Sequence, residues 1–133
     1  MRRKALTILY VLTVLTLAGC QTRTRESAAI DDASLRNADG DAANWLMYGR
    51  TYDDHRFSPL REINEQTVAT LGLVWSRELG TTRGLEATPL VENGVIYTTG
   101  SWSVVHAIDA GTGEIRWTYD PKVPRAGSYF ICC

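Results

Sequence analysis

Short runs of alternating apolar and polar residues, each ended by a turn signal, constrain the fold of this chain more than any other feature. The pattern begins at Leu73 and predicts strands over 73–79, 86–91, 95–99, 103–108 and 114–119. Asn93-Gly94 separates two of these runs, and Asn-Gly is a preferred sequence for a two-residue hairpin. The last four strands span only about 35 residues, too few for a sheet to be stable by itself. We therefore expect an all-β fold in which another layer stacks on this sheet.

The residues before the first strand show a different pattern. Gly49 and Pro59 interrupt the stretch from Trp45 to Pro59, which favours an extended, packed segment over a helix. A short helix is predicted over 65–71, because Asn64 can cap its first turn and Gly72 can end it.

One turn carries a specific motif. Ala107, Asp109, Thr112, Gly113 and Trp117 occupy the fixed positions of A-x-D-x-x-T-G-x-x-x-W, which resembles the tryptophan-docking motif of quinoprotein β-propellers. The aspartate and threonine can bond backbone amides across the turn, the glycine permits an unusual backbone angle, and the tryptophan offers a flat surface that can wedge between sheets. A generic hairpin with a buried tryptophan is the alternative.

The resemblance predicts a fragment of a β-propeller. Trp75 ends a similar strand, Leu-Gly-Leu-Val-Trp, which we interpret as the last strand of a neighbouring blade. Residues 45–133 then hold about one four-stranded blade, an extra strand and the short N-terminal helix. A propeller has roughly four to eight blades of about 40 to 50 residues each, so we expect an incomplete propeller.

Further segments point to one group within the quinoproteins. They resemble the N-terminal portion of alcohol dehydrogenases that depend on pyrroloquinoline quinone (PQQ), the methanol and ethanol dehydrogenase family. This family resemblance implies oxidation of a primary alcohol to an aldehyde with PQQ and calcium, and transfer of the electrons to a cytochrome c. The segments are Arg56-Phe57-Ser58-Pro59-Leu60, Ile63-Asn64, Leu85-Glu86-Ala87-Thr88-Pro89-Leu90, Trp102-Ser103-Val104-Val105-His106-Ala107 and Cys132-Cys133.

The N-terminus has the pattern of an export signal. Arg2-Arg3-Lys4 precede an apolar run from Ala5 to Leu17 that is too short to span a bilayer as a resident helix. The run ends in Leu17-Ala18-Gly19-Cys20, which resembles the lipobox of bacterial lipoproteins. We expect a signal peptide over 1–19, lipidation of Cys20 and a periplasmic protein that contacts the membrane only through this anchor. An ordinary signal with an incidental cysteine is the alternative.

Composition adds two expectations. Residues 20–44 are polar and lack a periodic apolar face, which is typical of a flexible tether. The net charge is −1, with 14 basic and 15 acidic residues. This balance offers no cationic surplus for a phosphate backbone, so nucleic acid is not an expected partner.

The resemblance assigns three cofactor-binding residues. Cys132 and Cys133 match an adjacent cysteine pair that forms a disulfide against one face of the quinone, and two free thiols are the alternative. Glu86 matches a glutamate that reaches the carboxylate end of PQQ, with a solvated strand-end glutamate as the alternative. A carboxylate facing another carboxylate needs a shared proton, an arginine or a metal nearby.

Other candidate side chains are expected to be structural. Trp102 and His106 are interpreted as packing residues, and Arg50, Arg56 and Arg125 as surface or strand-packing residues.

No catalytic or metal-ligating residue is assigned within this chain. The family's catalytic aspartate and calcium ligands lie on later blades, so the 133-residue chain alone is expected to be inactive. The alternative function is a non-enzymatic propeller lipoprotein similar to scaffolds of outer-membrane assembly, for which the cysteine pair and Glu86 would be unnecessary.

Overall fold

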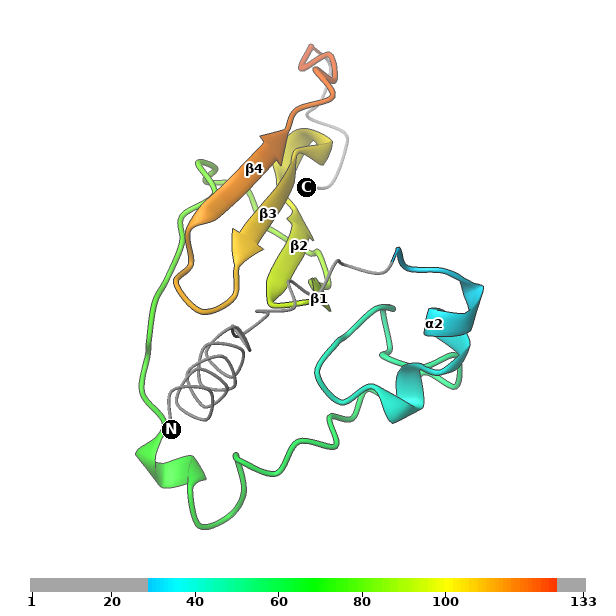
Figure 1. The fold of residues 1–133 in the computed structure, drawn as a ribbon. Coiled ribbons are helices and arrows are strands. Elements are labelled where there is room, and N and C mark those ends of the chain that lie inside the picture. The colour runs from blue at the N-terminus through cyan, green and yellow to red at the C-terminus, as the bar shows by residue number, and fades with distance from the viewer. Residues whose placement is uncertain (1–28, 127–133) are drawn as a thin grey trace, which may run out of the picture.

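A four-stranded antiparallel sheet organises the part of the chain that the computed structural model describes, residues 29–126. Its strands follow one another in chain order, as Figure 1 shows. They are β1 (Leu90–Glu92), β2 (Val95–Thr99), β3 (Val105–Asp109) and β4 (Ile115–Tyr119). This meander is consistent with one blade of the predicted all-β propeller, because each strand pairs with the next across a short connection.

Turn chemistry fixes the register of the sheet. Asn93 and Gly94 both have positive φ, 48° and 75°, as a two-residue hairpin requires, and Glu92 pairs with Val95 beside them. The 3-10 turn η3 (Ser101–Ser103) joins β2 to β3. A register shift between Ala107 and Ile108 marks an irregularity just before the turn that leads to β4.

The predicted strand bounds need three corrections. The strand over 73–79 is wrong: residues 73–79 form an extended segment that pairs with no strand among the described residues. The strand over 86–91 begins only at Leu90, directly after Pro89, which has no amide to donate to a ladder. The strand over 103–108 begins at Val105 because Trp102 and Ser103 have left-handed φ angles, 65° and 57°.

The predicted helix over 65–71 is reduced to one turn. The Asn64 side chain caps it as expected, accepting from the amides of Gln66 at 2.9 Å and Thr67 at 3.2 Å. Only Val68–Thr70 (η2) is helical, and it is a 3-10 turn. The β-branched residues in this stretch lose side-chain freedom in a helix, which disfavours a longer one.

Residues 29–44, part of the predicted tether, contain two short helical elements that the sequence did not predict. The helix α2 (Asp32–Arg36) begins at a capping box, in which the amide of Ser34 donates to the Asp31 carboxylate at 2.8 Å. The 3-10 turn η1 (Ala38–Gly40) follows, and Ala38 is buried. The residues that cap short helices are polar, so a composition rich in them is hard to distinguish from that of a tether.

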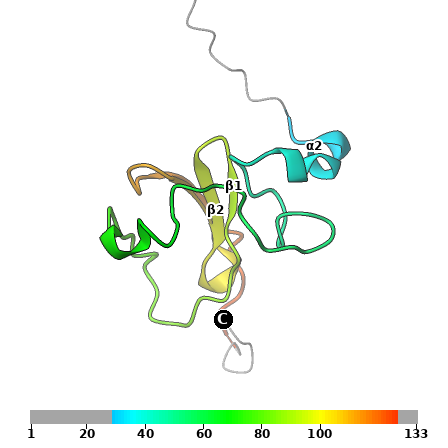
Figure 2. The ribbon, with the colours of Figure 1, turned by 90° about the horizontal axis from the view of Figure 1, so that it is seen from below.

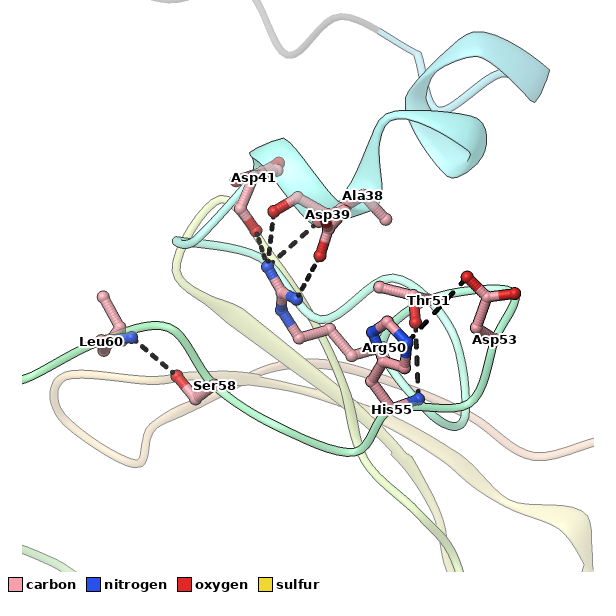
Figure 3. Close-up of polar contacts among 9 residues, drawn as sticks. All are labelled: Ala38, Asp39, Asp41, Arg50, Thr51, Asp53, His55, Ser58 and Leu60. Atoms are coloured by element: carbon pink, nitrogen blue, oxygen red, sulfur yellow. Dashed lines mark hydrogen bonds and ion pairs between the residues drawn. The ribbon is translucent and has the colours of Figure 1, made fainter.

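Arg50 is buried against η1 rather than lying on the surface or on a strand. Its Nη2 donates to the carbonyl oxygens of Ala38 (3.2 Å), Asp39 (3.0 Å) and Asp41 (3.4 Å), and its Nη1 lies 3.4 Å from the Asp39 carboxylate. Figure 3 shows the guanidinium directed into this turn. Five donors in a planar group suit a cluster of carbonyl oxygens. Arg50 therefore holds η1 against the 45–59 segment.

The 45–59 segment contains no helix, as predicted, but it forms turns instead of one extended stretch. The amide of Arg56 donates to the Gly49 carbonyl at 2.9 Å. Its first residue reaches the sheet: Trp45 and Val91 exchange two backbone hydrogen bonds of 2.8 and 2.9 Å. The N-terminal elements are thus fixed to the outer edge of β1, and Figure 2 shows α2 and the green segment that carries η2 on opposite sides of the sheet.

The core among the described residues is small. Ala38, Val95, Ala107 and Ile108 are its buried apolar side chains, whereas Trp117 on β4 is 48% exposed. Leu73 and Val74 are each 85% exposed. Apolar surface on this scale is typical of an interaction face. Within residues 29–126, no helix has the length and apolarity to cross a membrane.

Candidate functional site

The motif turn between β3 and β4 is organised by one carboxylate. Asp109 Oδ1 accepts from the amides of Gly111 and Thr112, each at 2.9 Å, and Arg116 Nη2 donates to Asp109 Oδ2 at 2.6 Å. The Arg116 guanidinium, followed by the Thr112 amide, lowers the pKa of Asp109 to about 2. The Thr112 hydroxyl accepts from the Glu114 amide at 3.3 Å. Asp109 and Thr112 therefore both bond backbone amides in this turn, as predicted.

The turn is a socket for Trp75. Gly113 has φ of 73°, and a Cβ at this position would lie 2.6 Å from Cδ2 and Cε3 of the Trp75 ring. The indole N–H of Trp75 donates to the Ala110 carbonyl at 3.0 Å, and Arg77 Nε donates to the Gly113 carbonyl at 2.7 Å. Side chains from the 73–79 segment thus join it to the sheet, although its backbone forms no ladder.

Trp117, the last residue of the motif, is not the tryptophan seated on this turn. Its ring contacts Tyr97, with centroids 6.0 Å apart, and it stands on the outer strand β4. Its predicted position between two sheets stays a prediction, because the described residues contain a single sheet.

A second region of interest is the η3 end, the end of the sheet where Thr99, Val105 and Tyr119 pair. β2 leads into η3 there, and β4 leads out into residues 120–126. The chain also enters β1 from this end, because Leu90 pairs with Tyr97 and Glu92 with Val95. Figure 1 shows η3 (yellow) and the segment after β4 (orange) close together.

The predicted cofactor residues relate to the η3 end in different ways. Glu86 is exposed and lies in the segment that enters β1. Cys132 and Cys133 lie outside the described residues, as do Cys20 and the predicted signal peptide. Their predicted roles stay predictions.

Three side chains at the η3 end form a cluster that sequence reasoning missed. The Arg83 Cζ lies 5.0 Å from the centroid of the Trp102 ring, and the Arg125 Cζ lies 5.4 Å from it. The sequence predicts only a structural role for Trp102, and no sequence pattern singles out Arg83. Cation–π contacts between distant segments leave no periodic pattern in a sequence.

His106 agrees with its structural interpretation. It is buried on β3, and its Nδ1 lies 3.2 Å from the Thr118 hydroxyl on β4. Among residues 29–126, no group of three or more His, Cys, Asp or Glu side chains could hold a metal ion.

Comparison with known proteins identifies the family. Residues 45–132 match the PQQ family described as Glucose/ethanol/alcohol dehydrogenase, beta-propeller domain. This chain belongs to that family. The match spans the turns of residues 45–59, the Trp75 socket and the whole sheet.

Several relatives are dehydrogenases. The chain is 45% identical over 126 residues to quinohemoprotein alcohol dehydrogenase ADH-IIG of Pseudomonas putida, covering 94% of this chain and 18% of that protein. It is 50% identical over 91 residues to the 1-butanol dehydrogenase (cytochrome c) of Thauera butanivorans, covering 67% and 13%. The chain therefore spans less than a fifth of the length of these relatives.

Solved structures of family members share the fold. The structure of ADH-IIG superposes with a TM-score of 0.67 and 52% identity, covering 69% of this chain and 14% of that one. A europium-containing methanol dehydrogenase gives a TM-score of 0.61 and 31% identity, covering 68% and 16%. These values support a partial β-propeller.

Proposed function

We propose that this chain forms the N-terminal part of a PQQ-dependent enzyme that oxidises primary alcohols to aldehydes and passes the electrons to a cytochrome c. The family match over residues 45–132 carries this proposal. The similarity to a cytochrome c-linked 1-butanol dehydrogenase supports both the substrate class and the acceptor.

The side chains at the η3 end suit an anionic, flat cofactor. PQQ carries carboxylates on a fused ring, and when bound it accepts a hydride from the alcohol carbon while the alcohol proton passes to a base. The guanidinium groups of Arg83 and Arg125 are concentrated at the end of the sheet that Glu86 approaches. This supports Glu86 as a ligand of the cofactor's carboxylate end, because nearby cations make two facing carboxylates tolerable.

We assign the flat face of the quinone to Cys132 and Cys133, joined as a disulfide. An adjacent pair can bridge only in a constrained ring, which gives a rigid surface for stacking. Alkylation mass spectrometry without prior reduction is expected to find both sulfur atoms protected in the exported protein. Complete alkylation of both would reject the bridge.

Calcium does not fit the described residues by themselves. The ion takes six to eight oxygen ligands, and within 29–126 no group of three or more carboxylate, histidine or cysteine side chains is placed so that it could hold a metal ion. We propose that the calcium ligands and the catalytic aspartate belong to other blades of a complete enzyme. The 133-residue chain alone is accordingly expected to show no alcohol oxidation with PQQ and calcium.

Export and lipidation complete the proposal. A signal peptide over 1–19 and a lipid on Cys20 would place the enzyme in the periplasm, tethered to a membrane. Metabolic labelling with a fatty acid is expected to mark the wild-type chain and not a Cys20→Ser variant. Equal labelling of both would reject the anchor.

The decisive experiment supplies the blades that this chain does not contain. Residues 45–133 replace the matched part of ADH-IIG of Pseudomonas putida, and PQQ binding and alcohol-dependent reduction of an artificial acceptor are measured. We expect both to be retained in the chimera. Glu86→Gln should weaken PQQ binding, whereas Glu65→Gln, an exposed glutamate on the η2 segment, should not.

Two outcomes would contradict the enzymatic proposal or the role of Glu86. A folded chimera that neither binds PQQ nor oxidises alcohol would refute the enzymatic proposal and favour the non-enzymatic scaffold. Equal PQQ affinity for Glu86→Gln and Glu65→Gln would remove Glu86 alone from the proposed site.

A further inference from the structure

We infer that Trp102 is a positioning residue: its indole ring fixes the segment that carries Glu86 against the segment that leads towards Cys132 and Cys133. This inference rests on the proposed function, because it concerns the alignment of the proposed quinone site. It is distinct from the docking of Trp75, which lies at the opposite end of the sheet.

The backbone of η3 supports a specific role for this ring. Trp102 has φ of 65° and Ser103 has φ of 57°, and large side chains rarely adopt this conformation. The surrounding turn is closed by the Gly100 amide, which donates to the Val104 carbonyl at 2.7 Å. Strained backbone of this kind is concentrated at functional sites. Here it presents the indole to two guanidinium groups.

Each partner of the ring belongs to a different segment. Arg83 precedes Glu86 by three residues, so their Cα atoms lie at most about 10 Å apart. Arg125 lies in the segment after β4, on the way to the cysteine pair. Their guanidinium carbons lie 5.0 and 5.4 Å from the Trp102 ring centroid, within the range of cation–π attraction.

A second contact fixes the Glu86 side of this arrangement. The hydroxyls of Thr81 and Ser101 lie 2.9 Å apart, and Ser101 is buried at the start of η3. The 81–83 segment is therefore held to η3 at two points. The segment after β4 has the Arg125 contact with the ring, and β4 itself as its anchor.

The first test measures whether the ring joins the two segments. Limited trypsin digestion of the full 133-residue chain, followed by mass spectrometry, reports cleavage after Arg83 and after Arg125. For Trp102→Ala, we expect each bond to be cut faster by about 2- to 5-fold, because each segment loses one cation–π contact. Trp102→Phe keeps an aromatic face and should restore most of the protection.

A matched control uses another cation–π pair on the same chain. The Arg56 Cζ lies 4.5 Å from the Tyr48 ring centroid, far from η3 in the sequence. Tyr48→Ala should speed cleavage after Arg56 and leave Arg83 and Arg125 protected, while Trp102→Ala should do the reverse. Unchanged cleavage after either Arg83 or Arg125 in Trp102→Ala would overturn the inference.

The second test asks whether the ring positions the quinone site. In the chimera with ADH-IIG, Trp102→Ala should weaken PQQ affinity by at least about fivefold and Trp102→Phe should stay near wild type. Undiminished affinity in Trp102→Ala, with the trypsin effect present, would overturn the positioning role alone. Failure of the unsubstituted chimera to bind PQQ would instead refute the proposed function, and the positioning role with it.

Discussion

Replacing Gly113 by alanine tests whether the motif turn is built around Trp75. The new Cβ would lie 2.6 Å from two atoms of the Trp75 ring, closer than real Cβ contacts allow. Gly94→Ala is the matched control, because Gly94 has nearly the same φ, 75° against 73°, and a Cβ added there would meet no heavy atom within 4 Å. Both variants therefore share the strain of an alanine at positive φ, and only Gly113→Ala also clashes with the Trp75 ring.

The expected magnitudes follow from these contacts. An alanine at left-handed φ costs roughly 1 kcal/mol, which both variants share. At Gly113, displacing Trp75 also costs the indole hydrogen bond to Ala110, about 1 kcal/mol, and about 1 kcal/mol of packing. Gly113→Ala should then open the turn about 2 kcal/mol more easily than Gly94→Ala, a factor of about 30.

Hydrogen exchange of the Trp75 indole N–H in the full chain, followed by NMR, measures this difference directly. Trp75→Phe assigns the signal because it removes only that N–H. The Asp109 amide, which donates to the Glu114 carbonyl at 2.8 Å across the turn, provides a second probe. Equal exchange in Gly113→Ala and Gly94→Ala would show that Trp75 is not seated on the turn.

Two further predictions concern charged groups. The pKa of Asp109 is lowered to about 2 in the folded turn, so the stabilisation by its carboxylate is fully present above the ordinary pKa of 3.8 and is lost as the pH falls towards 2. The NMR shifts of the Gly111 and Thr112 amides should change in this pH window. An Asp109→Asn variant whose amide shifts titrate identically would contradict the assignment. Arg50→Ala should destabilise η1 by about 2 to 3 kcal/mol, since one buried guanidinium serves three carbonyls. Exchange of the Gly40 and Asp41 amides measures it, with the exposed Arg61→Ala as control; equal effects would count against the buried role.

Local sequence signals predicted the elements that depend on neighbouring residues. The hairpin at Asn93-Gly94, the strand over 95–99 and the Asn64 cap all appear in the structure, because each depends on a backbone angle or a side chain within a few positions. The strand over 73–79 failed because alternation describes which faces can be buried, not which backbone is available to pair.

The candidate site divides along the same line. Glu86 and the cysteine pair are predicted through resemblance, since a motif preserves residue types in order, and their roles stay predictions. Arg83 and Trp102 were not, because their contact joins positions that only the return of β2 into η3 brings together.

The family, the meander of short strands and the motif turn could be predicted from the sequence alone, because residue order and side-chain period encode them directly. The three-dimensional fold was needed to show that Trp75 occupies that turn, that Arg50 is buried, and that two guanidinium groups contact the Trp102 ring. These contacts join residues that lie 9 to 35 positions apart, and their energy is gained only once the chain has folded back on itself.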